Sequence, residues 1–191
     1  MTSNRPDYID PAILRPERID RKVKVDRPDR RASRDIFSIY LHPDIPIDGD
    51  LVRQHKGDSE AARQELLDLA VEYMWRREPD TSFVEVFLRN GGVETLYWRD
   101  LASGALIRSV VERAKDFAIR RIIDGRSDNE GIGFDDLRQA IRVEYKENEI
   151  FPKSDAQEDW LKLLDYEPEN VATIRPIRAD RARPSIARDI I

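Results

Sequence analysis

The chain has 191 residues, of which 40% are hydrophobic and 37% charged, and its formal net charge at pH 7 is only −5. This mixture of charges argues against general nucleic-acid binding, which favours a basic domain, and against simple disorder, which combines low hydrophobicity with high net charge. The absence of cysteine excludes disulfides, thiolate metal sites and thiol catalysis.

The first expected elements are a short strand and a helix. Prolines interrupt residues 1–28 and exclude a long helix there, whereas residues 22–25 alternate polar and apolar side chains as a short strand does. Residues 29–41 carry apolar side chains at steps of three and four and begin with Asp29, a suitable N-cap, so they predict a helix. Residues 42–57 contain proline and glycine and are expected to form a connection.

A second helix and a β-hairpin should follow. Residues 58–77 have one apolar stripe at helical spacing, and Pro79 is expected to end that helix. Over residues 82–98 the apolar side chains change to strand-like spacing on both sides of Asn90-Gly91-Gly92. This pattern predicts a β-hairpin with a glycine turn.

The second half of the chain is predicted to be mainly helical. The strongest helix covers residues 99–123, with Ser103 as a capping residue and Gly125 as its end. Further helices are expected at residues 132–150 and 155–164, a strand at 171–177, and a flexible tail at 179–191. The expected core consists of Leu66, Leu69, Val110, Val111, Ala114, Ile119, Leu137 and Ile141.

Two motifs near the N-terminus are highly specific. Residues 4–7 read Asn-Arg-Pro-Asp, and residues 10–21 read Asp-Pro-Ala-Ile-Leu-Arg-Pro-Glu-Arg-Ile-Asp-Arg. Together they resemble the second region of homology of AAA ATPases. The resemblance implies that Arg15 and Arg18 are arginine fingers that reach the nucleotide of a neighbouring subunit, and that Asn4 holds the sensor-1 position. Glu17 replaces the family's usual glycine and can pair with either finger.

A third motif agrees with this resemblance. Ser103-Gly104-Ala105 opens the 99–123 helix and is similar to the Ser-Gly-Ala turn at the sensor-2 position of AAA lid domains. The resemblance implies that this turn packs against adenine and ribose, because glycine at a helix start lets a ligand approach the backbone. The family pattern continues with aspartate, whereas Leu106 follows here, so one contact is lost.

The order of elements resembles one branch of these ATPases. A hairpin just before Ser-Gly-Ala, then Glu-Asn-Glu at residues 147–149 and Asp-Trp at 159–160, is similar to the bacterial proteasomal ATPases. These include the mycobacterial proteasome ATPase and the ATPase forming ring-shaped complexes. The implied fold is mainly α: a remnant of the α/β AAA large domain at residues 1–28, a helical lid with an inserted β-hairpin at 29–178, and the tail at 179–191.

The resemblance also implies a function. The full-length relative would be a hexameric unfoldase that hydrolyses ATP with Mg²⁺ and delivers proteins carrying a ubiquitin-like tag to a 20S proteasome. This chain contains no Gly-x-x-x-x-Gly-Lys-Ser/Thr motif, so alone it should be inactive and bind no nucleotide tightly. Ile190 and Ile191 end the chain where close relatives carry a Gln-Tyr-Leu tail that docks on the proteasome.

Neither a metal site, a membrane span nor a nucleic-acid partner is expected. His42 and His55 are not spaced as a metal-binding pair, no apolar run approaches the ~20 residues of a membrane span, and no signal peptide opens the chain. The sequence therefore predicts a cytoplasmic protein. Two other functions stay open: a stand-alone module that binds AAA subunits or a protease, and an unrelated helical adaptor. An upstream Walker A and B sequence would favour the ATPase.

Overall fold

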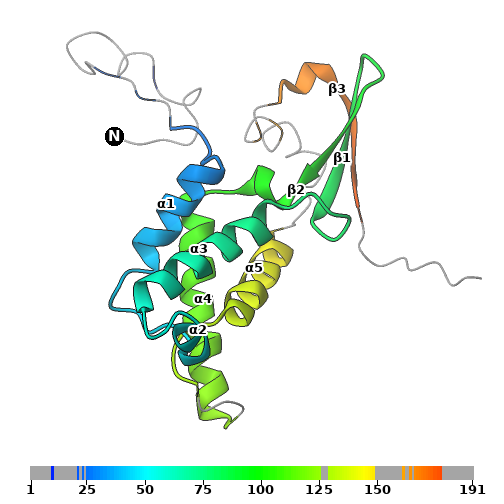
Figure 1. Ribbon diagram of the computed structural model, residues 1–191. Coiled ribbons are helices and arrows are strands. Elements are labelled where there is room, and N and C mark those ends of the chain that lie inside the picture. The colour runs from blue at the N-terminus through cyan, green and yellow to red at the C-terminus, as the bar shows by residue number, and fades with distance from the viewer. Residues whose placement is uncertain are drawn as a thin grey trace, which may run out of the picture.

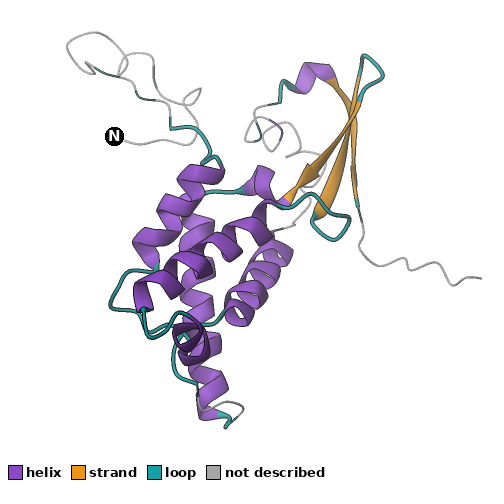
Figure 2. Ribbon diagram, in the orientation of Figure 1, coloured by secondary structure: helices purple, strands orange, loops and turns teal. Residues whose placement is uncertain are grey.

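A computed structural model describes residues 10, 21, 23, 25–125, 129–148, 161, 164 and 166–177. In this part of the chain, four longer helices pack together and a three-stranded sheet stands beside one end of them (Figure 1). Figure 2 shows how the orange strands are set apart from the purple helices. The mainly helical fold class with a small sheet is therefore confirmed for the described residues.

The first and third helices begin where the sequence predicts. Helix α1 (Arg30–Tyr40) follows Asp29, whose carboxylate accepts a hydrogen bond from the Ala32 amide at 2.7 Å. Helix α3 (Ser59–Trp75) follows Asp58, which accepts from two amides of the first turn, both at 3.0 Å. These side chains satisfy amides that a helix start leaves without intrahelical partners.

The connection between these helices contains a helix that the sequence analysis missed. Helix α2 (Gly49–Gln54) begins after Asp48, whose carboxylate accepts hydrogen bonds from the amides of Asp50 and Leu51. The prediction of a plain loop at residues 42–57 was wrong here. Six residues span less than two helical turns, so no apolar periodicity can develop in the sequence.

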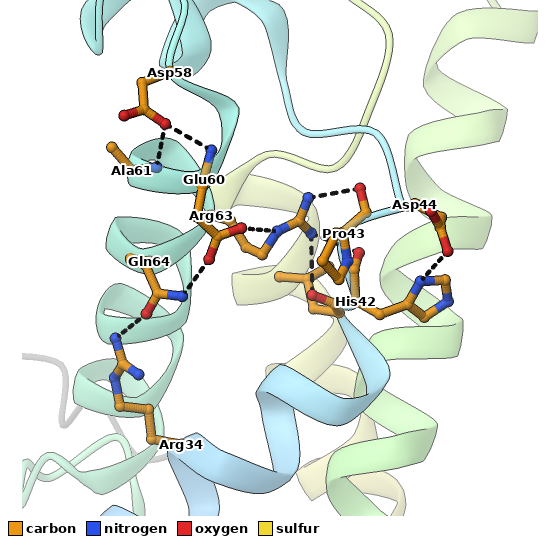
Figure 3. Close-up of polar contacts among 10 residues, drawn as sticks. Arg34, His42, Pro43, Asp44, Asp58, Glu60, Ala61, Arg63 and Gln64 are labelled. Carbon is orange, nitrogen blue, oxygen red and sulfur yellow. Dashed lines mark hydrogen bonds and ion pairs between the residues drawn. The ribbon is translucent and has the colours of Figure 1, made fainter.

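A buried arginine ties this connection to α3. Arg63 is only 4% exposed, and its guanidinium donates hydrogen bonds to the carbonyls of Leu41, His42 and Pro43 at 3.1, 2.7 and 2.9 Å. Its Nε also contacts Glu60 at 3.2 Å (Figure 3). The planar fork of donors thus satisfies carbonyls at and just after the C-cap of α1, where the chain has no intrahelical N–H donor to offer them.

Helix α4 (Gly104–Ile123) crosses the bundle and packs mainly against α5 (Phe134–Asn148) and α1. It begins later than the predicted residue 99, because Trp98–Leu101 forms a separate 3-10 turn, η2. Arg113 of α4 pairs with Glu144 at 3.1 Å and with Glu147 at 2.6 Å, which joins the two helices. The helix predicted within residues 132–150 is confirmed as α5, but it begins at Phe134, because Ile132 forms a β-bridge with Ile47. Residues 149 and 150 lie outside the described residues.

The connection that precedes α2 contacts the connection that precedes α5. Ile47 and Ile132 form a parallel bridge, with hydrogen bonds from the Ile132 amide to the Pro46 carbonyl and from the Asp48 amide to the Ile132 carbonyl. Gly131 has a φ of +93°, and a Cβ placed there would lie 2.5 Å from the Ile47 carbonyl carbon. Only glycine allows both this conformation and this approach.

The sheet contains the predicted hairpin and one more strand. Strand β1 (Ser82–Leu88) lies between β2 (Val93–Tyr97) and β3 (Val171–Pro176), and both pairings are antiparallel. A short turn, η4 (Pro168–Asn170), leads into β3. The predicted strand at 171–177 is thus confirmed, and the structure adds its partner. The 155–164 helix falls almost entirely outside the described residues.

Most of the predicted core is buried, but Ile119 is not. Val110, Val111, Leu137 and Ile141 are fully buried, as are Leu66 and Ala114. Ile119 is 54% exposed, and Ile122 and Ile123 on the same end of α4 are also exposed. The reason is visible in Figure 1, where this end of α4 extends past the other helices. Leu69 is half-buried.

The predicted strand at residues 22–25 is not supported. Val23 and Val25, its two described members, lie outside any strand and are 80% and 89% exposed. Alternation of polar and apolar side chains indicates a strand only where a neighbouring strand supplies hydrogen bonds.

Candidate functional site

The start of α4 holds the predicted Ser103-Gly104-Ala105 turn. Ser103 is extended, its Oγ accepts a hydrogen bond from the Leu106 amide at 3.2 Å, and its carbonyl accepts from the Ile107 amide at 3.0 Å. The capping role predicted for Ser103 is confirmed. The amides of Gly104 and Ala105 belong to the first turn, where a helix provides no acceptor of its own.

The surroundings of Gly104 leave room for a ligand. Gly104 is half-buried, and a Cβ placed on it would meet none of the described atoms within 4 Å. Ala105, the next residue, is exposed. A helix start with free amides and open space beside a glycine suits the close approach of a polar or anionic group.

The η2 turn connects this helix start to the chain that enters the lid. Arg27 lies just before α1, and its Nη1 donates a hydrogen bond to the Asp100 carbonyl at 3.1 Å. The Asp100 carboxylate in turn accepts from the Tyr97 amide at 2.8 Å. Only two residues separate Asp100 from Ser103. The structure thus brings residue 27 and the Ser103 turn into the same region.

The rings behind η2 are packed tightly. Trp98 stacks on Tyr145 of α5, with ring centroids 5.0 Å apart and planes 3° apart. Tyr145 is fully buried, and its hydroxyl has no hydrogen-bond partner among the described residues. Burial raises the pKa of this phenol, and the positive charge of Arg27 opposes that effect.

The other predicted site residues lie outside the described part of the chain. These are Asn4, Arg15 and Arg18, together with Ile190 and Ile191. The neighbouring Glu17 lies outside it too. Their roles as fingers, sensor and docking residues stay predictions.

Two open grooves lie elsewhere on the described surface, along β2. One, of about 440 Å³, is lined by Arg77, Arg99, Asp100 and Tyr166 among others; the second, of about 490 Å³, includes Arg89 and shares Tyr166. The Tyr166 hydroxyl donates to Glu94 at 2.5 Å between them. Burial, followed by this carboxylate, raises the pKa of Tyr166. Neither groove includes the Ser103 turn.

Among the residues that the structure describes, no three histidine, cysteine, aspartate or glutamate side chains cluster as a metal site would require. Across the described helices, none combines the length and apolar character needed to cross a bilayer.

The sequence analysis missed Arg27 and Asp100 as members of this region. They are 73 residues apart, and the acceptor is a backbone carbonyl, which every residue carries. No side-chain pattern therefore marks the contact. The one local signal is Asp100 three residues after Tyr97, the spacing at which a carboxylate can accept from the backbone of a turn.

Comparison with known proteins agrees with the arrangement of helices and hairpin. The family model described as "ARC, AAA+ ATPase lid domain" matches residues 28–190. A proteasome-associated ATPase from Acidimicrobium ferrooxidans is 44% identical over 174 residues, which are 91% of this chain and 30% of that protein. A second, from Acidothermus cellulolyticus, is 39% identical over 98% of this chain and 32% of its own length.

A third relative has a different name from the first two. An AAA ATPase forming ring-shaped complexes from Kocuria rhizophila is 46% identical over 162 residues, which are 84% of this chain and 28% of that protein. The chain therefore spans about a third or less of the length of these relatives. By the match of the lid model over most of its residues, the chain belongs to the ARC-type AAA+ ATPase lid domain family.

Proposed function

We propose that this chain is the C-terminal portion of a ring-forming AAA+ ATPase that works with a proteasome, and that the start of α4 covers the bound nucleotide. Membership of the lid family and the names of the relatives support the general assignment. The observation that carries the nucleotide role is the open space at Gly104 beside a serine-capped helix start.

The chemistry of the turn fits an adenine nucleotide. Ser103 orders the first turn of α4 by accepting from the Leu106 amide. Gly104 lacks a side chain, so a base or ribose can lie directly against the backbone. The helix start also carries a partial positive charge that favours a phosphate-bearing ligand. Such a turn contributes contacts but not the phosphate cradle, so the chain alone should bind nucleotide weakly and not hydrolyse it.

The proposed catalytic contribution lies in the N-terminal motif. Arg15 and Arg18 would reach the nucleotide of the neighbouring subunit, where their fixed charges stabilise the negative oxygens that develop in phosphoryl transfer. Asn4 would orient the attacking water. ATP and Mg²⁺ would be held by the complete nucleotide-binding domain.

The wider role follows the same proposal. Six subunits would form a cytoplasmic ring that unfolds proteins marked by a ubiquitin-like tag and passes them to a 20S proteasome. Ile190 and Ile191 would supply a short apolar end with a free carboxylate, which suits a small basic pocket on a partner. The ring and proteasome in the names of the relatives support this assignment.

The decisive experiment replaces Gly104 with leucine in an ATPase that carries this chain behind its nucleotide-binding domain. In this chain a Cβ at residue 104 meets open space, so Gly104→Leu should fold. A bound nucleotide would collide with it. The KM for ATP should therefore rise about tenfold or more, a loss of ~1.4 kcal/mol or more of binding.

Arg108→Leu is the matched control, because it adds the same side chain to an exposed position one helical turn further along α4. It should leave the KM for ATP unchanged, and both variants should keep the wild-type melting temperature. An unchanged KM in Gly104→Leu would remove the nucleotide role from this turn.

A further inference from the structure

The contact between Arg27 and the η2 turn joins two parts of the chain that the proposed function uses separately. Arg27 directly follows the segment with the predicted fingers, and its guanidinium donates to the Asp100 carbonyl at 3.1 Å. Asp100 lies in η2, which leads to Ser103 through the fully buried Ala102. This hydrogen bond therefore links the Arg27 side chain to the segment that leads into α4.

The η2 turn is well suited to transmit such a change to α4. Its amides are held by neighbouring groups: Tyr97 donates to the Asp100 carboxylate at 2.8 Å and Ala102 to the Arg99 carbonyl at 3.1 Å. Trp98 donates through its amide to the Thr81 carbonyl at 3.0 Å. Only two residues, of which Ala102 is fully buried and hydrogen-bonded, separate Asp100 from Ser103, so the position of the Asp100 carbonyl is coupled to the start of α4.

Helix α5 also packs against the turn. Trp98 stacks against Tyr145 with centroids 5.0 Å apart, and the Tyr145 hydroxyl is buried without a partner among the described residues. The turn is therefore held both by Arg27 of the chain that enters α1 and by the aromatic packing on α5.

We propose that Arg27 is a positioning residue for nucleotide binding: its hydrogen bond to the Asp100 carbonyl holds the Ser103-Gly104-Ala105 turn against the chain that enters α1. This role rests on the proposed nucleotide function of that turn. A guanidinium is required because it donates at a distance from its own backbone while keeping a fixed charge and plane.

The first test needs no nucleotide and uses the 191-residue chain. Arg27→Ala should speed hydrogen exchange at the amides of Tyr97 and Ala102, whereas Arg31→Ala, at an exposed position of α1, should not. Arg27→Lys, which keeps a cationic donor, should restore part of the protection. Equal exchange rates in wild type and Arg27→Ala would overturn the proposal.

The second test measures kinetics in an ATPase that carries this chain. Arg27→Ala should raise the KM for ATP about tenfold, because a hydrogen bond from a charged group is lost, while kcat at saturating ATP stays within about twofold. Arg27→Lys should lie between the two. A loss of kcat at unchanged KM, or no effect, would overturn the positioning role.

Gly104→Leu separates the two proposals. If Gly104→Leu raises KM and Arg27→Ala does not, the nucleotide role of the turn stands and the role of Arg27 is wrong. If neither variant changes KM, both are wrong. Both Arg27→Ala and Arg31→Ala should remain folded at the assay temperature, with a modest fall in melting temperature for Arg27→Ala alone; if Arg27→Lys recovers the melting temperature but none of the KM, the residue has a purely structural role.

Discussion

Individual polar and glycine residues hold the connections of this lid in place. Arg63 lies in α3 and holds the connection that follows α1, whereas Gly131 lies in the connection before α5. Arg63 supplies several donors to carbonyls at the end of α1 and just after it, and Gly131 lets two connections approach within van der Waals distance. Both positions should therefore be sensitive to substitution.

Replacing Arg63 with methionine should destabilise the chain by about 3 kcal/mol, because a side chain of similar length then leaves three carbonyls without their donor. Chemical denaturation monitored by circular dichroism measures this change. Arg108→Met, at an exposed position of α4, should change the unfolding free energy by less than ~0.5 kcal/mol. Similar stability of the two variants would show that the buried guanidinium is dispensable.

Gly131→Ala should cost at least about 3 kcal/mol, because the new methyl group would lie 2.5 Å from the Ile47 carbonyl carbon in addition to straining the backbone. Gly125→Ala is the matched control: its φ is also positive, at +63°, but nothing lies within 4 Å of the added Cβ. It should cost only the backbone term, about 1–2 kcal/mol. Equal losses in thermal unfolding would contradict the close contact.

At the scale of the secondary-structure element, α4 has two ends with different environments. Its first half is buried against α1 and α5, with Ile107 and Val110 fully enclosed. Its last turns, with Ile119 and Ile123, extend past the bundle. The apolar stripe is continuous in the sequence, so burial changes along a helix whose pattern does not.

Ile107→Ala and Ile119→Ala place the same substitution at these two ends. The buried change should cost about 2–5 kcal/mol, because it leaves a cavity, whereas the change at the 54% exposed Ile119 should cost less than ~1 kcal/mol. Urea titrations of the two variants give both values. A large loss at Ile119 would mean that the end of α4 is covered in solution.

At the scale of the whole molecule, the catalytic prediction depends on neighbouring subunits. In the proposed function the described lid covers the bound nucleotide, and the predicted fingers lie in residues 1–28. Since a finger acts on the nucleotide of the next subunit, its effect appears only in the assembled ATPase.

Arg15→Ala and Arg18→Ala should each lower ATP turnover strongly while ATP affinity is preserved, because fingers stabilise the transition state rather than the bound substrate. Arginine fingers acting in trans are worth about 10³–10⁵ in rate in well-studied cases. Mixing a finger variant with a P-loop variant should restore part of the activity, since some interfaces regain both parts. Wild-type turnover in the double mutant Arg15→Ala, Arg18→Ala would refute the assignment.

What the sequence by itself determined is local. The caps Asp29 and Ser103 and the glycine turn of the hairpin were predicted correctly because their hydrogen bonds join residues two or three positions apart. The resemblance to the AAA ATPases likewise rests on short contiguous motifs, whose neighbouring residues act together at one site.

Only the tertiary structure decided the rest, because those features join segments far apart in the chain. Strand β3 pairs with β1 more than 80 positions earlier, and Arg27 donates to a carbonyl 73 positions later. Gly131 is constrained by the backbone of Ile47. Ile119 is exposed because the last turns of α4 extend past the neighbouring helices. The periodicity of side chains does not show which backbone groups pair across the chain, or how far a helix extends past its neighbours. These features can be read only from the packed structure.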